Sequence, residues 1–96
     1  MAKGYIVVTY RKITNKDKWA AYAKLAVPAI QAQGGRFIVR NMPTRTYESG
    51  MNERVVIVEF DSVQAAIKAH DSPGYAEALR ALGDGAERDM RIVEGI

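Results

Sequence analysis

The sequence predicts an α+β domain in which a four-stranded antiparallel sheet carries helices on one face. Strand-like and helical patterns follow one another in the order strand, helix, strand, strand, broken helix, strand. The segment Arg54–Phe60 indicates a strand that is apolar on both faces, because Val55 to Val58 is unbroken. Two strand-helix-strand units with right-handed crossovers give the ferredoxin-like βαββαβ arrangement, here as one domain over residues 1–96.

The amino-terminal part supplies a strand and a long helix. Gly4 to Arg11 is rich in β-branched and aromatic residues, which favour a strand. Asn15 is placed to cap a helix over Lys16 to Gln33, where apolar residues recur at three- and four-residue steps. Pro28 lies inside this pattern and cannot donate a backbone hydrogen bond, so we expect a kink or a broken last turn there.

A glycine pair separates the helix from the second strand. Gly34 and Gly35 are typical of a helix end, and a short strand is expected over Arg36 to Arg40. Asn41 to Asn52 predicts a long hairpin connection, within which Thr44 to Glu48 could extend either strand.

The carboxy-terminal part predicts two helices in succession and a closing strand. Ser62 is placed to cap a helix over Val63 to His70. Ser72-Pro73 provides a second cap with proline at the first helical position, and the helix that follows ends at Gly83-Asp84-Gly85. The segment from Met90 to Glu94 predicts the fourth strand.

The alternation of side chains sorts the strands into two faces. The helix-facing set is expected to comprise Ile6, Val8, Phe37, Val39, Val56, Val58 and Phe60. The opposite face then carries the apolar residues Val7, Ile38, Val55, Ile57 and Ile92. Because so large an apolar patch is unusual on a soluble monomer, we expect a second copy to cover it, giving a homodimeric α+β barrel through the open sheet face.

Polar residues on the open face have two interpretations. Tyr5, Thr9, Arg40, Glu59 and Glu94 would point toward the enclosed space between the sheets. They form either a structural network that sets the dimer register or the polar end of a ligand pocket. In the second interpretation Arg40 would recognise a carboxylate or enolate and Glu59 would act as a base.

Three further side chains on the helices are candidates. His70 is the default group for proton transfer, since its ordinary pKa lies near neutrality, although a helix-terminal role is the alternative. Tyr22 and Tyr75 fall among apolar residues at helical spacing, where each is either a core residue or a ligand-binding hydroxyl. The candidate catalytic residues are therefore Glu59 and His70, and the candidate ligand-binding residues are Tyr5, Thr9, Tyr22, Arg40, Tyr75 and Glu94.

Composition excludes several classes of function. Cysteine is absent and histidine occurs once, which excludes thiol chemistry and a multi-histidine metal site within one chain. No glycine-rich phosphate loop is present, so no cofactor is expected. The 14 basic residues are scattered among 11 acidic ones, which argues against nucleic-acid binding. No segment has the length of a membrane span and the amino terminus lacks a secretory apolar core, so a cytoplasmic location is expected.

A set of short motifs along the chain resembles domain-of-unknown-function family 1330, within the dimeric α+β barrel superfamily. The motifs are Gly34-Gly35-Arg36-Phe37, Arg54 to Ser62, Ala65-Ala66, Asp71-Ser72-Pro73 with Tyr75, and Val93-Glu94-Gly95. The resemblance implies a ferredoxin-like protomer and a homodimer. Related barrels include small monooxygenases, haem-degrading enzymes, muconolactone isomerases and stress-response proteins, so fold alone leaves the activity open.

Two functions are consistent with these observations. The first is a homodimer that binds a small, partly apolar molecule and carries out cofactor-independent proton transfer or oxygenation. The second is a non-catalytic dimeric binding or stress-response module whose barrel interior is structural. An open cavity beside Arg40, Glu59 or His70 would favour the first, and an interior filled with paired side chains the second.

Overall fold

The computed structural model describes residues 2–96 and shows one antiparallel sheet of four strands in the order β2-β3-β1-β4. The central strands are β1 (Gly4–Ile13) and β3 (Val55–Phe60), and the edge strands are β2 (Arg36–Asn41) and β4 (Ala86–Glu94). Each neighbouring pair of strands is antiparallel, and this order is that of the predicted ferredoxin-like fold.

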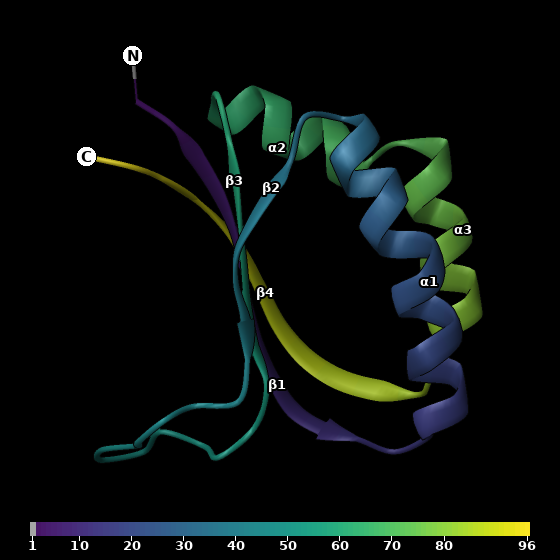
Figure 1. Cartoon of the computed structure of the whole chain (residues 1–96), viewed down its shortest axis with the longest axis vertical. Coiled ribbons are helices and arrows are strands. Elements are labelled where there is room, and N and C mark those ends of the chain that lie inside the picture. The colour runs from purple at the N-terminus through teal and green to yellow at the C-terminus, as the bar shows by residue number, and fades with distance from the viewer. Residues whose placement is uncertain (1) are drawn as a thin grey trace.

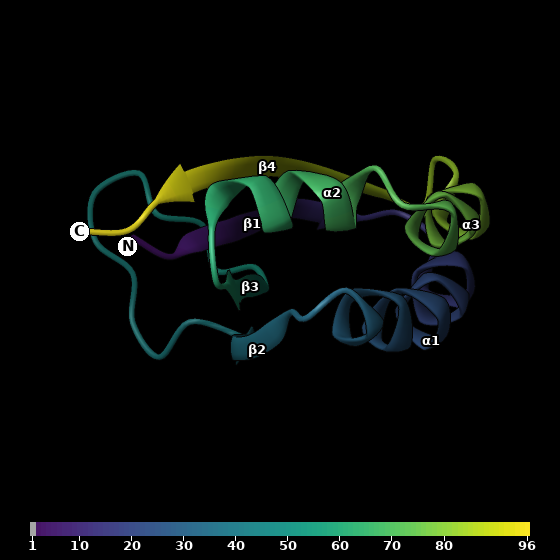
Figure 2. The same cartoon turned by 90° about the horizontal axis from the view of Figure 1, so that it is seen from above.

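All three helices lie on the same side of the sheet, and the other side carries none (Figure 1). They are α1 (Lys16–Ala32), α2 (Val63–His70) and α3 (Pro73–Leu82). The short helix α2 packs directly on β1, β3 and β4, whereas α1 and α3 pack mainly against each other. Viewed from above, α1 lies on the side of β2 and α3 on the side of β4 (Figure 2).

The predicted capping residues begin the helices. The side chains of Asn15, Ser62 and Ser72 accept hydrogen bonds from backbone amides three residues on, at 3.0, 3.1 and 3.4 Å. The expected break at Pro28 is wrong, because α1 continues through it to Ala32. The buried residue Ile30, beyond the proline, packs in the core, and packing of this kind holds a helix together where one hydrogen bond is missing.

The strand boundaries differ most from the sequence prediction at the end of β1 and the start of β4. The strand β1 runs two residues beyond Arg11, and β4 begins at Ala86 rather than at Met90. The added part of β4, Ala-Glu-Arg-Asp, has no apolar alternation, but it pairs with the end of β1 as far as Ile13. The segment Thr44–Glu48 extends neither strand and belongs to the connection between β2 and β3.

A glycine pair lets the chain turn sharply from α1 into β2. Gly34 has a φ of 88°, in the region that favours glycine. A Cβ atom on Gly35 would lie 2.5 Å from Ile30 Cγ2 and 2.9 Å from Phe60 Cζ, so only glycine fits against the core there. This close approach brings β2 into the sheet directly after the helix.

Most of the predicted helix-facing set is confirmed. Ile6, Val8, Val58 and Phe60 are buried in the core, and Phe37 and Val56 pack against it. The assignment of Ile92 to the open face is wrong, since it pairs with Ile6 and packs against the core. Its neighbour Val93 lies on the open face with 47% of its surface exposed. Both residues are apolar, so alternation alone could not orient this strand.

A bulge in β2 changes the faces of two other residues. Phe37 pairs with Val58, but the next paired residue is Val39, opposite Ile57, so Ile38 is the extra residue. The placement of Val39 in the core and of Arg40 on the open face is therefore wrong. Val39 shares the open face with Ile57, and Arg40, opposite Val56, lies on the helix side.

The open face is a mixture of apolar and charged side chains. Its apolar residues are Val7, Val39, Val55, Ile57 and Val93. Charged residues toward its ends pair with one another, as Arg36 does with Glu59 and Arg91 with Asp89. Among residues 2–96, no helix is long and apolar enough to cross a membrane.

Candidate functional site

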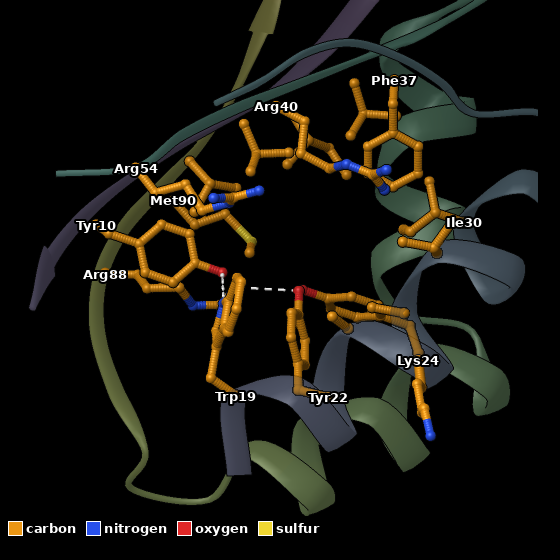
Figure 3. Close-up of a pocket in the computed structure, with 18 of the residues that line it drawn as sticks. Tyr10, Trp19, Tyr22, Lys24, Ile30, Phe37, Arg40, Arg54, Arg88 and Met90 are labelled. Atoms are coloured by element: carbon orange, nitrogen blue, oxygen red, sulfur yellow. Dashed lines mark hydrogen bonds between the residues drawn. The ribbon is translucent and has the colours of Figure 1, made fainter. Parts of the chain in front are cut away.

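A cavity of about 470 Å³ lies between α1 and the helix-facing side of the sheet (Figure 3). Its walls are mainly aliphatic and aromatic. Seven of the aliphatic lining residues are Ile6, Val8, Ala23, Ala26, Ile30, Val56 and Val58, and the aromatic ones are Tyr10, Trp19, Tyr22, Phe37 and Tyr75. The cavity forms here because α1 packs mainly on α3, and only α2 lies directly on the sheet.

Three arginines from separate segments reach this cavity: Arg40 from β2, Arg54 from the residue before β3, and Arg88 from β4. The bulge at Ile38 brings Arg40 to this side. Every one of the three guanidinium groups stacks on an aromatic ring. The distances from Cζ to the ring centre are 5.2 Å for Arg40 and Phe37, 5.1 Å for Arg54 and Trp19, 5.6 Å for Arg88 and Tyr10, and 4.8 Å for Arg88 and Tyr22.

Hydrogen bonds fix the aromatic side chains at the inner end of the cavity. Trp19 Nε1 donates to the Tyr10 hydroxyl at 3.1 Å, and Arg88 Nη1 donates to the Tyr22 hydroxyl at 3.0 Å. The Tyr22 and Tyr75 hydroxyls are 2.7 Å apart. Burial raises the pKa of Tyr22 well above its ordinary value, so its hydroxyl is protonated at neutral pH.

The three arginines have no acidic partner in the part of the chain that the structure describes. No carboxylate oxygen of residues 2–96 lies within 4.0 Å of the guanidinium nitrogens of Arg40, Arg54 or Arg88, and no Asp, Glu or His lines the cavity. Lys24 also lines it, but its ammonium group points away (Figure 3). The pocket arginines alone carry as much charge as the net +3 of the whole chain.

The structure brings together three of the residues predicted from the sequence. Tyr22, Arg40 and Tyr75 all line the cavity. The predicted pairing of Arg40 with Glu59 is wrong, because the two side chains lie on opposite faces of the sheet. The bulge in β2 is the reason, and Arg36 rather than Arg40 stands opposite Glu59.

Glu59 belongs to a charged cluster on the open face. It accepts hydrogen bonds from Arg36 Nε and from the Tyr5 hydroxyl, each at 3.1 Å, and Arg36 also contacts Asp61 at 3.2 Å. The hydrogen bond from Arg36 is the main reason that the pKa of Glu59 lies below its ordinary value. A base needs a free carboxylate near a substrate, and this one is engaged within its own chain.

The remaining candidates lie apart from the cavity. Thr9 is exposed on the open face, under the connection between β2 and β3. The placement of Glu94 on the open face is wrong, because it pairs with Gly4 two residues beyond Ile92 and so lies on the helix-facing side, exposed at the end of β4. His70 Nδ1 is 3.0 Å from an Asp71 carboxylate oxygen, and its ring packs 5.3 Å from that of Tyr75, without lining the cavity.

Sequence reasoning missed Arg54 and Arg88, together with the aromatic partners Tyr10 and Trp19. Arg54 directly precedes the apolar run of β3, and Arg88 lies in the part of β4 that lacks a strand pattern. An available signal was the position of Arg54, which is two residues from Val56 and hence on the same, helix-facing side.

The arrangement suits binding of a molecule with an apolar body and oxygen acceptors. It supplies apolar and aromatic walls, three cations, and hydroxyl groups that can donate. Within residues 2–96, no three His, Asp or Glu side chains lie close enough together to hold a metal ion.

Solved structures with this fold are similar to the chain over nearly all of its length. One is a protein of unknown function from Rhodopseudomonas palustris, with a TM-score of 0.72, 16% identity, and coverage of 99% of this chain and 83% of that one. SnoaB from Streptomyces nogalater, a cofactor-independent oxygenase, has a TM-score of 0.56, 14% identity and coverage of 96% and 89%. A dimeric ferredoxin-like protein of unknown function from Bacteroides fragilis has a TM-score of 0.57, 15% identity and coverage of 97% and 95%.

At these identities the likeness shows the fold alone. No functionally curated protein matches the chain. Residues 3–96 match the family described as "Domain of unknown function (DUF1330)", and the chain therefore belongs to that family.

Proposed function

We propose that this protein binds a small, partly apolar molecule in the cavity between α1 and the sheet. The observation that carries the proposal is the cavity itself, about 470 Å³, with apolar walls and three arginines at its surface. Ligand pockets typically measure roughly 300–1,000 Å³, and this cavity, which is partly open to solvent, falls within that range. A cavity of this size beside Arg40 favours ligand binding over a purely structural interior.

The proposal includes a homodimer formed through the open sheet face. Val7, Val39, Val55, Ile57 and Val93 would then be buried against a second copy, with the Arg36–Glu59 pair at the rim. The dimeric Bacteroides fragilis protein of similar fold supports this assembly. Sedimentation should give the mass of a dimer at micromolar concentration, and Val39→Asp should shift it to that of a monomer; a wild-type monomer would refute the assembly.

For the chemistry, we propose cofactor-independent oxygenation or proton transfer on the bound molecule. Support comes from SnoaB, a cofactor-independent oxygenase of similar fold, and from the arginines, whose charges would stabilise an enolate or phenolate form of a substrate. Neither Glu59 nor His70 lines the cavity, so the proposal gives neither a catalytic role.

A second candidate is binding without chemistry, as in a carrier or stress-response module. It is favoured by the absence of Asp, Glu and His among the cavity residues, since these are the usual general bases. Incubating the protein with a bound compound in air separates the two: a new product or oxygen uptake indicates an enzyme, and recovery of the unchanged compound indicates a binding protein.

The location of binding can be tested with two variants of α1. Ala23 lines the cavity, whereas Ala21 is exposed and does not. A small-molecule library is screened by thermal shift, and each compound that stabilises the wild type is retested on Ala23→Phe and Ala21→Phe. We expect Ala23→Phe to lose the shift and Ala21→Phe to keep it. Equal shifts in both variants would place binding elsewhere and refute the proposal.

A further inference from the structure

We propose that the ligand is a planar aromatic carboxylate whose carboxylate group binds Arg88 at the inner end of the cavity. This inference rests on the proposed function, because it names the class of molecule that the same cavity takes. It follows from the charge, the hydrogen-bonding capacity and the shape of the site.

The charge of the site favours an anion. Arg40, Arg54 and Arg88 reach one cavity, and no carboxylate of residues 2–96 pairs with them. Three like charges around one cavity repel one another, and a bound anion offsets that repulsion by attracting all three. Most arginines elsewhere in the described residues pair with acids, as Arg36 does with Glu59 at 3.1 Å and Arg91 with Asp89 at 3.0 Å. The pocket arginines therefore stand out as the group left for an external partner.

The hydrogen bonds within the site leave mainly donors free. The Tyr10 hydroxyl oxygen already accepts from Trp19, and the Tyr22 hydroxyl oxygen already accepts from Arg88. The remaining groups are the Tyr10 hydroxyl proton, one proton of the Tyr22–Tyr75 pair, and the other guanidinium N–H groups. A ligand that offers acceptor oxygens satisfies these donors, whereas an ammonium group, which has no lone pair, cannot.

The shape of the site favours a flat molecule with its acid group inward. The Arg88 guanidinium is stacked against both Tyr10 and Tyr22, which orients its planar fork. Such a fork binds both oxygens of a carboxylate in one plane. The walls beyond it include the rings of Trp19 and Phe37, on which an aromatic body can stack.

The other two arginines lie at different distances from Arg88. Arg54 lies near the same end, beside Trp19, whereas Arg40 lies toward the opposite end, beside Phe37 (Figure 3). Arg40 is exposed on Phe37, and Arg54 is half-buried on Trp19. Both are placed to hold a second oxygen of the ligand or to attract the anion during entry.

The test uses calorimetry with matched probes on the full chain. The probes are 2-naphthoate, its neutral primary amide 2-naphthamide, and octanoate, which has the charge without the flat ring. We expect 2-naphthoate to bind at least about tenfold more tightly than either of the others, since an ionic hydrogen-bonded pair and ring stacking each contribute on that scale. Equal binding of the amide overturns the carboxylate assignment, and equal binding of octanoate overturns the aromatic one. No binding of 2-naphthoate at millimolar concentration overturns both.

Variants assign the contact to Arg88. Arg88→Lys keeps the charge but loses the fork, so we expect it to weaken 2-naphthoate roughly tenfold and to leave the amide unchanged. Arg80→Gln, on the exposed side of α3, is the control for a lost surface charge and should change nothing. Should Arg88→Lys fold poorly, Arg54→Gln provides the second test and should also weaken the carboxylate selectively. Unchanged 2-naphthoate affinity in a folded Arg88→Lys protein overturns the role of Arg88.

The failure of this inference is distinguishable from that of the proposed function. If the amide binds as well as the acid, and Ala23→Phe abolishes both, the cavity is the site and only the ligand class is wrong. If Ala23→Phe binds both probes as tightly as the wild type does, the cavity is not the site.

Discussion

Filling the cavity should stabilise the protein, because the space is present whether or not a ligand occupies it. Ala23 lines the cavity on α1 and packs at the edge of the core. The substitution Ala23→Leu adds carbon atoms that contribute about 0.8 kcal/mol each when buried, or about 2.4 kcal/mol in total. Ordering the longer side chain costs about 1 kcal/mol. The net expectation is a stabilisation of about 1.5 kcal/mol, equivalent to a rise in Tm of roughly 6–12 °C for a domain of this size.

A second alanine provides the control. Ala66, on α2, is fully buried where the helix packs directly on the sheet, and it does not line the cavity. Ala66→Leu should therefore destabilise the fold by about 1–3 kcal/mol through overpacking. Urea unfolding followed by far-ultraviolet circular dichroism, at one fixed protein concentration, gives both free energies. If Ala23→Leu is as destabilising as Ala66→Leu, the cavity is filled in solution and the reasoning about the site fails.

Two other predictions concern the frame around the site. Ser72→Ala should lower the free energy of unfolding, measured in urea, by about 1–2 kcal/mol. The buried Ser72 hydroxyl donates to the Ala69 carbonyl at 2.7 Å and caps α3 by accepting from the Tyr75 amide. An unchanged free energy of unfolding would contradict that role. Arg36 holds the pKa of Glu59 below its ordinary value of 4.5. As the pH falls, Glu59 is therefore protonated in the unfolded chain before it is protonated in the folded protein. The stability that this pair contributes is present at neutral pH and lost below about pH 4.5. Between pH 7 and pH 3, Tm should fall less for Glu59→Gln than for the wild type. An equal fall in Tm for the two proteins would contradict the assignment.

The order of elements and the helix starts could be predicted from local signals. Asn15, Ser62 and Ser72-Pro73 each mark a helix start that depends on one side chain and the amides next to it. Pairing between strands is not local, and the prediction failed where pairing decided the structure. The first half of β4 is a strand because β1 extends to Ile13 beside it, although its own sequence is polar.

The candidate site was harder to predict because it breaks the rule used to find the core. Alternation assigns apolar residues to the buried side and charges to the open side, so it discards a charged residue on the helix-facing side. Arg88 occupies such a position, opposite the buried Tyr10, and Arg54 falls on the same side as Val56. Charged residues at positions where the alternation expects apolar ones are common at functional sites, because binding requires particular polar groups there.

The bulge at Ile38 links the two faces of the sheet. It keeps Arg36 on the open face, where Glu59 and Tyr5 hold it in an ion-paired cluster at the rim of the proposed dimer. Four residues later, the same strand delivers Arg40 to the opposite side, where no carboxylate of residues 2–96 lies within 4.0 Å of its guanidinium group. In a regular strand both arginines would have faced the same way, because residues four apart share a face. One extra residue therefore separates an arginine of the open face from an arginine of the proposed binding cavity, and it explains why Arg40 does not meet Glu59.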